Sequence, residues 1–416
     1  MAGLNAVPSG ERVHIGFFGL RNVGKSSLVN AVTGQDLAVV SDVKGTTTDP
    51  VQKAMELLPI GPVVIIDTPG IDDAGGLGEM RVERARRVLR KCDIAVLVTE
   101  AGRDLLPAEE ELVALFHTRG IPFVVAENKC DIAQCHPERG TETPSPCHPE
   151  RSGEAAKSRD LFPHSIPVSA LTGTNIHELK ELIGRLAQDA EPEKHLVADL
   201  LSPGDTVVLV VPIDASAPKG RIILPQQMVL RDVLDAHASA MVCQPEELSG
   251  VLDACARPPR IVITDSQAFA QVARIVPEDL PLTSFSILMA RYKGELTPFA
   301  RGAQAIGTLE DGDRVLISEG CTHHRQCEDI GTVKMPAWIR AHCGANPVFD
   351  FTSGGEFPDD LSPYALVVHC GGCMLNAREM RYRMQLAEAA GVPIVNYGIA
   401  IAHMHGILDR SLQPFR

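Results

Sequence analysis

The sequence predicts an α/β fold, in which a P-loop nucleotide-binding domain precedes two smaller α/β domains. Residues 19–26 read Gly-Leu-Arg-Asn-Val-Gly-Lys-Ser, a phosphate-binding pattern, between an apolar strand at 13–18 and a helix that follows the loop. Apolar strands alternate with helical segments further along the chain, which favours parallel sheets. A charged segment at 191–195 separates the first part of the chain from a region of different composition.

The loop at 19–26 is predicted to hold nucleotide phosphates with its backbone amides, at the N-terminus of the following helix. In this interpretation the Lys25 ammonium pairs with the β- and γ-phosphates, and the Ser26 hydroxyl is one ligand of Mg²⁺. The other nucleotide contacts predicted in this loop are Gly19, Asn22, Val23, Gly24 and Ser27. The alternative is a glycine turn that arose by chance.

Two further segments are predicted to respond to the γ-phosphate. The sequence Gly-Thr-Thr-Thr-Asp at 45–49 predicts a mobile loop in which a threonine reaches Mg²⁺; we favour Thr47 over Thr46 and Thr48. The buried strand and turn at 63–70 end in Asp-Thr-Pro-Gly, so that Asp67 would hold Mg²⁺ through water and the Gly70 amide would sense the γ-phosphate. The alternatives are a solvated extended segment and a plain turn.

Base selection is predicted at the end of the apolar strand that leads into Asn128, Lys129 and Asp131. The Asp131 carboxylate can accept two hydrogen bonds from guanine, from N1 and from the exocyclic amine, whereas adenine does not offer this pattern. A site built around a carboxylate rejects the wrong base, because its charge would then stay unpaired. A last base-contacting turn is predicted at Ser169, Ala170 and Leu171. Together these motifs predict GTP as the ligand.

With four motifs in order, residues 13–188 resemble the translation-factor-like GTPases, in the branch of Era and the tRNA-modification enzymes. This resemblance implies hydrolysis that depends on K⁺ bound near Asn22, because Ile71 stands where Ras-like enzymes carry a catalytic glutamine. The residues to which we assign catalysis are Asn22, Lys25, Thr47 and Gly70. An ordinary turn role for Asn22 is the alternative.

Composition limits the classes of function. With 39 basic and 53 acidic residues among 416, the net charge of −14 disfavours nonspecific binding to nucleic acid or to a membrane surface. The first residues do not follow the signal-peptide pattern and no run of 18 apolar residues occurs, so we expect a cytoplasmic protein. Eleven cysteines in a reducing compartment favour metal ligation or thiol chemistry over disulfides.

The segment at about 134–160 is predicted to be a low-complexity insertion. The pentapeptide Cys-His-Pro-Glu-Arg occurs at 135–139 and again at 147–151. Two Cys-His pairs are able to bind zinc, but the surrounding Pro, Glu, Ser, Thr and Gly residues favour an inert solvated loop. We therefore expect GTP binding to survive deletion of residues 134–158.

The remainder of the chain predicts two more domains, and we place the domain boundaries at 1–190, 195–275 and 276–416. In the middle region the pattern predicts strands at 207–213 and 260–264 with a helix over 228–241 between them, and Cys243 and Cys255 are expected to be small core residues. In the last region it predicts strands at 314–320, 364–369 and 392–398, and a helix over about 375–390 that Gly391 can cap.

Three cysteines follow the ends of two predicted strands, where ligands gather in parallel sheets. Cys321 follows the strand at 314–320, and Cys370 and Cys373 flank two glycines after the strand at 364–369. Three thiolates and glycines that permit close backbone approach suit a 4Fe-4S cluster with one exchangeable iron. The alternatives are zinc, which would normally complete four ligands, and a redox dithiol. His323 and His369 are each as consistent with a structural role as with ligation; Cys327 and Cys343 are expected to be bystanders.

A cation-dependent GTPase joined to Cys-Thr-His at 321–323 and His-Cys-Gly-Gly-Cys at 369–373 resembles the [FeFe]-hydrogenase maturation GTPases, the HydF family, over nearly the whole chain. The resemblance implies a GTPase domain, a dimerisation domain and an iron-sulfur cluster-binding domain, and a homodimer. It also implies a scaffold or carrier, which receives a di-iron precursor from two radical-SAM maturases and delivers it to apo-[FeFe]-hydrogenase.

Two competing functions share the N-terminal motifs. A tRNA-modification or ribosome-associated GTPase would need an RNA-facing surface, which the acidic composition disfavours. A zinc-stabilised regulatory GTPase would differ from the favoured interpretation only in its metal.

Overall fold

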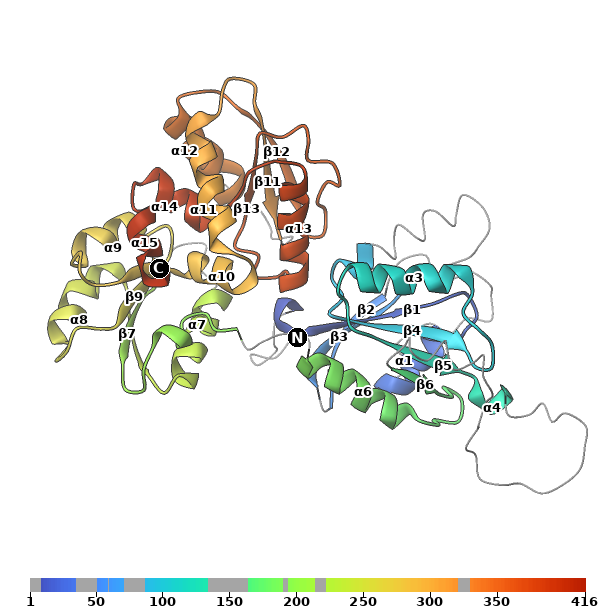
Figure 1. Ribbon diagram of the computed structural model, residues 1–416. Helices are drawn as coiled ribbons and strands as arrows, with labels where there is room; N and C mark the ends of the chain where they lie inside the picture. Colours follow the sequence, from blue (N-terminus) through green and yellow to red (C-terminus); the bar gives the residue numbers. More distant parts are fainter. Residues whose placement is uncertain are drawn as a thin grey trace, which may run out of the picture. The chain divides into compact units, whose positions relative to one another are not determined.

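The computed structural model describes residues 9–34, 51–58, 60–70, 87–133, 164–189, 194–213, 222–320 and 330–416 (Figure 1). The chain divides into two compact units, Met1–Pro192 and Glu193–Arg416, which we describe one at a time. Among the helices of the described ranges, none has the length and apolar character needed to cross a membrane.

The first unit is built on a six-stranded sheet of order β2-β3-β1-β4-β5-β6. Strand β2 runs antiparallel to β3, and the other neighbouring strands are parallel. The strands are β1 Val13–Phe18, β2 Val51–Leu57, β3 Gly61–Asp67, β4 Ile94–Glu100, β5 Phe123–Asn128 and β6 Ser165–Pro167. The helices are α1 Lys25–Thr33, α3 Pro107–Thr118, α4 Cys130–Ala133 and α6 Ile176–Asp189.

Helices cover both faces of this sheet (Figure 1). Because successive side chains of a strand point to opposite faces, Phe17 and Phe18 enter different cores. Phe17 packs with Leu28 of α1 and Ile183 of α6, and Phe18 packs with Phe116 of α3. The two filled cores fix the sheet, and the loops that follow its parallel strands meet at one edge.

The second unit begins with a four-stranded parallel sheet of order β10-β9-β7-β8. Strand β10 pairs with β9 of this sheet, and it lies after residue 275, where the sequence predicts a domain boundary. The elements are β7 Thr206–Val210, α7 Leu224–Asp235, β8 Ser239–Cys243, α8 Leu248–Ala254, β9 Ile261–Thr264, α9 Phe269–Ile275, β10 Leu282–Ser284 and α10 Phe285–Lys293.

The helix predicted over 228–241 was wrong at its C-terminal end. Helix α7 ends at Asp235, and His237 turns the chain with a left-handed φ of 56°. Residues 239–241 then pair with 206–208 of β7 as part of β8. Pairing with β7 therefore overrides the helical periodicity of these residues. A local sequence pattern contains no information about a partner strand elsewhere in the chain.

The second sheet of this unit has the order β12-β11-β13-β14 and is parallel throughout, which confirms the parallel sheet predicted for the C-terminal region. Right-handed crossovers place α12, between β11 and β12, and α13, between β13 and β14, on opposite faces. The elements are α11 Leu296–Gln304, β11 Arg314–Glu319, α12 Met335–Cys343, β12 Val348–Ser353, β13 Leu366–His369, α13 Ala377–Ala389, β14 Ile394–Asn396, α14 Tyr397–Met404 and α15 Leu408–Leu412.

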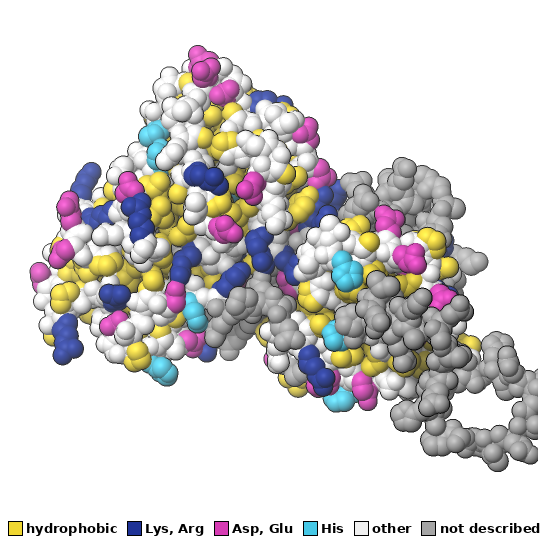
Figure 2. All heavy atoms as spheres, in the orientation of Figure 1, with side chains coloured by type: hydrophobic (Ala, Val, Ile, Leu, Met, Phe, Trp, Pro, Cys, Tyr) yellow, Lys and Arg dark blue, Asp and Glu magenta, His cyan; other side chains and the backbone are white. Residues whose placement is uncertain are grey.

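The surface carries both signs of charge. In Figure 2 the Lys and Arg side chains are interspersed with Asp and Glu on the visible face of the described residues. Exposed apolar side chains include Val242 on β8 and Val348 and Phe351 on β12. Both strands are the outermost described strands of their sheets, so their free edges are surfaces on which another chain can pair.

Candidate functional site

The phosphate-binding loop lies between β1 and α1. Gly24 precedes the helix with a left-handed φ of 88°, and α1 begins at Lys25. The Lys25 Nζ donates hydrogen bonds to the carbonyl oxygens of Gly19, at 3.1 Å, and Leu20, at 2.6 Å. The loop therefore curls around this ammonium, and Ser26 and Ser27 follow in the first turn of the helix.

Ser26 and Asp67 bring α1 and the end of β3 together. The Ser26 Oγ donates a hydrogen bond of 2.6 Å to Asp67 Oδ2. Burial raises the pKa of Asp67, an effect that the Ser26 hydrogen bond and the Lys25 charge oppose. The other oxygen, Asp67 Oδ1, is buried without a hydrogen-bond partner among the described residues. Oxygen ligands of this kind suit Mg²⁺, so this pair fits the predicted ion.

Two other predicted contacts lie at the same loop. A Cβ atom added to Gly70 would lie 2.8 Å from the Arg21 Cα, so glycine permits the close approach of this turn to the loop. Asn22 has a left-handed φ of 64°, which asparagine tolerates better than most residues. That conformation agrees with a turn role, and coordination of K⁺ stays a prediction. Thr46, Thr47, Thr48 and Ile71 lie outside the described residues.

Asn128 ties the phosphate loop to the turn at 169–171. Its Nδ2 donates to the Val23 carbonyl at 2.9 Å, and its Oδ1 accepts from the Ala170 amide at 3.0 Å. The side chain is buried, and a Cβ added to Gly24 would lie 2.3 Å from its Nδ2. Sequence reasoning placed Asn128 against the nucleotide and missed this tethering role, because both partners are remote in the chain.

The remaining predicted base contacts lie at the carboxyl ends of β5 and β6. Lys129 has a left-handed φ of 64° and pairs with Glu100 at 3.0 Å. Asp131 is in the first turn of α4, Ser169 Oγ accepts from the Thr172 amide, and Leu171 is exposed. Their contact with guanine stays a prediction.

The second candidate site is at the switch point of the C-terminal sheet. The chain leaves β11 toward β12 and leaves β13 toward β14, in opposite directions, and ligands bind in the crevice that such a switch creates. Gly320, directly after β11, and Cys370, directly after β13, meet there, because the Gly320 amide donates to Cys370 Sγ at 3.0 Å. Cys321, the next residue of the chain, and His323 lie outside the described residues.

The surroundings of Cys370 suit a sulfur ligand. Burial raises the pKa of the Cys370 thiol to about 11, and the amides of Gly320 and Gly372 oppose that shift by donating to the sulfur. Amide hydrogen bonds to ligand sulfurs are typical of iron-sulfur sites. Gly372 supplies a left-handed φ of 64° in the turn to the half-buried Cys373. Within the described ranges no three metal-ligating side chains gather, and metal ligation by Cys370 and Cys373 stays a prediction.

Both ring nitrogens of His369 are engaged. Arginine can only donate, so His369 Nε2 accepts from Arg383 Nη1 at 3.0 Å, and Nδ1 donates to the Cys370 carbonyl at 2.8 Å. Burial, together with the Arg383 charge, lowers the pKa of His369 to about 3 and keeps the ring neutral. This arrangement holds the end of β13 and leaves no ring nitrogen free for a metal.

A buried arginine connects the strand ends around this site, and the sequence did not reveal it. Arg383 donates to Ser318 Oγ at 3.2 Å and to the Gly354 carbonyl at 2.8 Å, besides His369. Its charge is paired with Glu379, one turn earlier on α13, at 3.1 Å. The spacing of this pair was visible in the sequence, but the same spacing occurs in many exposed pairs.

A buried lysine supports the cysteine loop. Lys293, the last residue of α10, is 1% exposed. Its Nζ donates to the carbonyl oxygens of Gly372, Cys373 and Leu375 at 3.2, 3.1 and 2.5 Å. Nothing in the sequence distinguishes Lys293 from an ordinary basic residue in the last turn of a helix.

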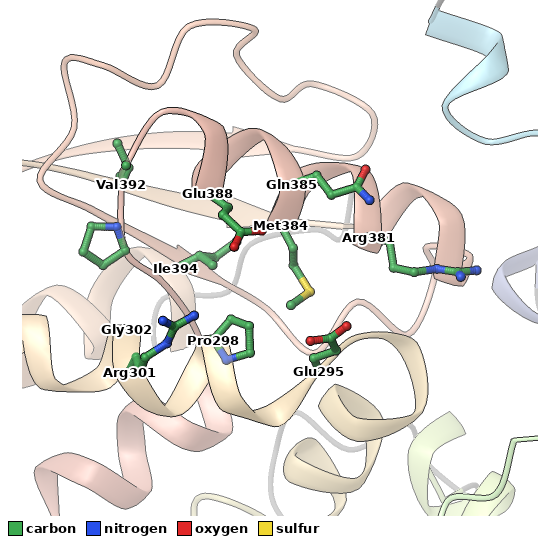
Figure 3. Close-up of a pocket in the computed structure, with 12 residues that line it drawn as sticks. Glu295, Pro298, Arg301, Gly302, Arg381, Met384, Gln385, Glu388, Val392 and Ile394 are labelled. Atoms are coloured by element: carbon green, nitrogen blue, oxygen red, sulfur yellow. The ribbon is translucent and has the colours of Figure 1, made fainter. Parts of the chain in front are cut away.

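A groove of about 440 Å³ lies between α11 and α13 (Figure 3). The Met384 side chain extends from α13 toward α11, and Val392 and Ile394 line one end. Glu295 and Arg301 line the α11 side, and Arg381 and Glu388 line the α13 side. Because both charge signs occur on both walls, the groove does not indicate a class of ligand.

Three family models match the chain. Residues 14–129 match the family described as 50S ribosome-binding GTPase. Residues 196–294 match the hydrogen maturase F dimerization domain, and residues 297–414 match the hydrogen maturase F tetramerization domain. The two hydrogen maturase F models together cover more than half of the chain.

Curated relatives match over smaller parts of their length. The GTPase Der of Wolinella succinogenes is 38% identical over 125 residues, which are 29% of this chain and 26% of that protein. The tRNA modification GTPase MnmE of Synechococcus sp. (strain JA-3-3Ab) is 33% identical over 191 residues, 45% of this chain and 37% of that protein. This chain thus spans between 26% and 37% of the length of these two relatives.

Among solved structures, Era of Aquifex aeolicus bound to GDP·AlF₄⁻ aligns with a TM-score of 0.34 and 20% identity, covering 56% of this chain and 93% of that chain. The assignment of the chain to a family therefore rests on the family models. Since a GTPase domain is followed by both hydrogen maturase F domains in one polypeptide, the chain belongs to the hydrogen maturase F family.

Proposed function

We propose that this protein is a GTP-hydrolysing scaffold or carrier, which binds a 4Fe-4S cluster and assembles or delivers the di-iron precursor of the [FeFe]-hydrogenase active site. One observation carries the proposal. Cys370 receives amide hydrogen bonds from Gly372 and from Gly320, the residue before Cys321, at the switch point of the C-terminal sheet. This supports Cys321, Cys370 and Cys373 as a shared ligand set.

At the nucleotide site, the Lys25 ammonium is proposed to exchange its hydrogen bonds to the loop carbonyls for contacts with the β- and γ-phosphates. Ser26 and Asp67 are proposed to hold the metal ion. When bound, Mg²⁺ neutralises charge that develops on the phosphates. Gly70 and Thr47 would respond to the γ-phosphate, with K⁺ near Asn22 supporting hydrolysis. The tether from Asn128 to Val23 and Ala170 supports a guanine pocket, with Asp131 reading the base.

On the cluster side, the chain supplies thiolates and holds them in place. The Gly320 and Gly372 amides stabilise the Cys370 thiolate, and the pairing of His369 with Arg383 fixes the strand end. Cys321, Cys370 and Cys373 would hold the cluster, and three cysteine ligands would leave one iron exchangeable, which is the chemistry that a carrier of a di-iron cargo needs. His369 is engaged elsewhere, which favours a structural role over ligation.

The partners follow from the family. Radical-SAM maturases as the source of the precursor, and apo-[FeFe]-hydrogenase as its recipient, are proposed on that basis. The matches to dimerization and tetramerization domains support self-association. As a further part of the proposal, nucleotide state changes the affinity for one of these partners through the loops at 45–49 and after Gly70. Equal affinity for every partner with GTP and GDP would contradict this coupling.

Anaerobic reconstitution with iron and sulfide, followed by EPR of the dithionite-reduced protein, tests the function. We expect the signal of a 4Fe-4S cluster in the wild type, and its loss in Cys370→Ser and Cys373→Ser with GTP hydrolysis retained. Cys343→Ser, a half-buried cysteine at the end of α12, is the matched control and should keep both. The same preparations should hydrolyse GTP faster in K⁺ than in Na⁺.

Zinc content without an iron-sulfur signal would contradict the proposal and favour a zinc-stabilised GTPase. Stoichiometric tRNA binding without a cluster would favour a tRNA-modification GTPase. Lys25→Ala should lose hydrolysis and keep the EPR signal, which separates the two halves of the proposal.

A further inference from the structure

We propose that Lys293 is a positioning residue for the metal site: its buried ammonium holds the cysteine loop in shape and places a positive charge beside the cluster. This inference rests on the proposed function, because it concerns the cluster that Cys370 and Cys373 would help to bind. It adds a residue outside the cysteine motif to that site.

The first step is the geometry of the ammonium. An ammonium group has three N–H donors, and three carbonyls of one short loop converge on Lys293, those of Gly372, Cys373 and Leu375. Withdrawing an ammonium from water without partners is strongly unfavourable. Lys293 is 1% exposed, so its burial requires partners such as these carbonyls. In return it donates a hydrogen bond to each of them, although the Gly372 carbonyl also accepts from the Leu375 amide at 3.0 Å.

The second step is the freedom of the loop itself. Gly371 and Gly372 are adjacent, and glycine populates more backbone conformations than other residues. Cys370 is anchored by β13, because its amide donates to the Ser318 carbonyl at 3.0 Å. Cys373 lies after the two glycines, and the carbonyls of Gly372 and Cys373 both accept hydrogen bonds from Lys293. The lysine therefore sets the position of the second thiol relative to the first.

The third step is the origin of the lysine. Lys293 lies in the part of the chain matched by the dimerization domain, whereas the cysteine loop lies in the part matched by the tetramerization domain. Cys373 also packs against the core that contains Leu288 and Met289 of α10. Two independent contacts therefore seat the loop on α10, and a displacement of this helix would reach the metal site.

The fourth step is electrostatic. A positive charge in a poorly solvated position stabilises the more negative, reduced state of a nearby cluster. Lys293 is buried in contact with the peptide groups of a ligand residue, Cys373. The charge should therefore raise the reduction potential of the bound cluster.

The test compares the full-length protein with Lys293→Met, which keeps the length of the side chain and removes its charge and donors. Without metal, we expect faster hydrogen–deuterium exchange of the amides of residues 371–376 in the variant. After reconstitution with iron and sulfide, we expect a lower reduction potential by EPR-monitored titration. GTP hydrolysis should not change.

Arg291→Met is the matched control. Arg291 lies on the same helix, carries the same charge, and pairs with Asp199 rather than with the loop. Its removal should leave both the exchange of residues 371–376 and the reduction potential as in the wild type. Equal effects of Arg291→Met and Lys293→Met would overturn the inference, because they would reflect the loss of any charge from α10.

Two further variants keep the test decisive if Lys293→Met does not fold, as judged by circular dichroism. Lys293→Arg keeps the charge and Lys293→Gln keeps donors without charge, so the Gln variant should have the lower reduction potential.

Equal reduction potentials in the Arg variant, the Gln variant and the wild type would overturn the electrostatic role. Unchanged hydrogen–deuterium exchange in the Met or Gln variant would overturn the positioning role. A wild-type protein that binds no cluster would instead refute the proposed function, and the exchange comparison would still decide whether Lys293 orders the loop.

Discussion

Among the ion pairs of the described residues, two that join side chains four residues apart in a helix differ in burial. Arg383 and Glu379 on α13 are 0% and 4% exposed, whereas Arg231 and Asp235 on α7 are 77% and 55% exposed. The buried guanidinium also serves Ser318 and His369. Its removal would take a hydrogen-bond donor from the buried Glu379 carboxylate and from the buried His369 Nε2.

We expect Arg383→Met to lower the free energy of unfolding of the second unit by about 3 to 5 kcal/mol, the usual cost of breaking a buried pair. The control, Arg231→Met, should change it by less than about 1 kcal/mol, because exposed pairs contribute little. Urea denaturation followed by circular dichroism measures both. A loss in Arg383→Met as small as that of the control would show that the network does not stabilise the strand ends.

The positions of single residues were predictable from the sequence where a local motif specifies the geometry of the backbone around them. Lys25, Ser26 and Asp67 lie around one loop because the P-loop pattern and the acidic end of β3 specify their local geometry. Lys293 and Arg383 were not predictable, because their partners come from segments that only the folded chain brings together. No local pattern marks a charged side chain as buried.

At the scale of elements, close contact between α11 and β14 depends on one glycine. A Cβ added to Gly302 of α11 would lie 2.0 Å from the Ile394 carbonyl oxygen, a backbone atom that cannot rotate away. By contrast, a Cβ added to Gly250 of α8 would meet nothing within 4 Å. The two helical glycines therefore differ in the space that an added methyl group would find.

We expect Gly302→Ala to destabilise the protein by about 1 to 3 kcal/mol through overpacking. Gly250→Ala should instead stabilise it by about 0.5 to 1 kcal/mol, because alanine restricts the unfolded chain and favours the helix. Thermal and urea unfolding of both variants give the comparison. Destabilisation of equal size in both would indicate that helix packing at Gly302 is not tight.

Elements were predictable where hydrophobic periodicity and tertiary pairing agree. The strands at β1, β11 and β13 are short apolar runs that end at turn residues, and each is buried in its sheet. In α7 and β8 the two signals disagree, because residues 239–241 continue a helical pattern and yet pair with β7. The partner strand lies more than 30 residues earlier, so a short stretch of sequence around β8 cannot reveal this pairing.

At the scale of the whole molecule, the insertion predicted at about 134–160 lies outside the described residues, but its flanks are described. The Val125 amide donates to the His164 carbonyl at 2.9 Å, and the Cys130 amide donates to the Val168 carbonyl at 3.2 Å. These bonds join β5 and α4 to β6 and its following turn. They involve no residue of the insertion.

Deletion of residues 134–158 should therefore leave GTP affinity within about twofold of the wild type, since shortening a long loop changes the free energy of closure only slightly. Titration with a fluorescent GTP analogue measures the affinity. A weakening of tenfold or more would show that the two Cys-His-Pro-Glu-Arg segments contribute to the nucleotide site. The domain boundaries at 190 and 275 remain predictions.

The seating of the cysteine loop on α10 has a consequence for transplanting the metal pocket into another scaffold. The natural place to cut is between the two hydrogen maturase F modules, after residue 294 and before residue 297. A chimaera that carries only the later module would keep Cys370 and Cys373 and lose the ammonium to which their loop is fastened. The smallest portable unit is therefore larger than the module boundary indicates, and it begins at the start of α10.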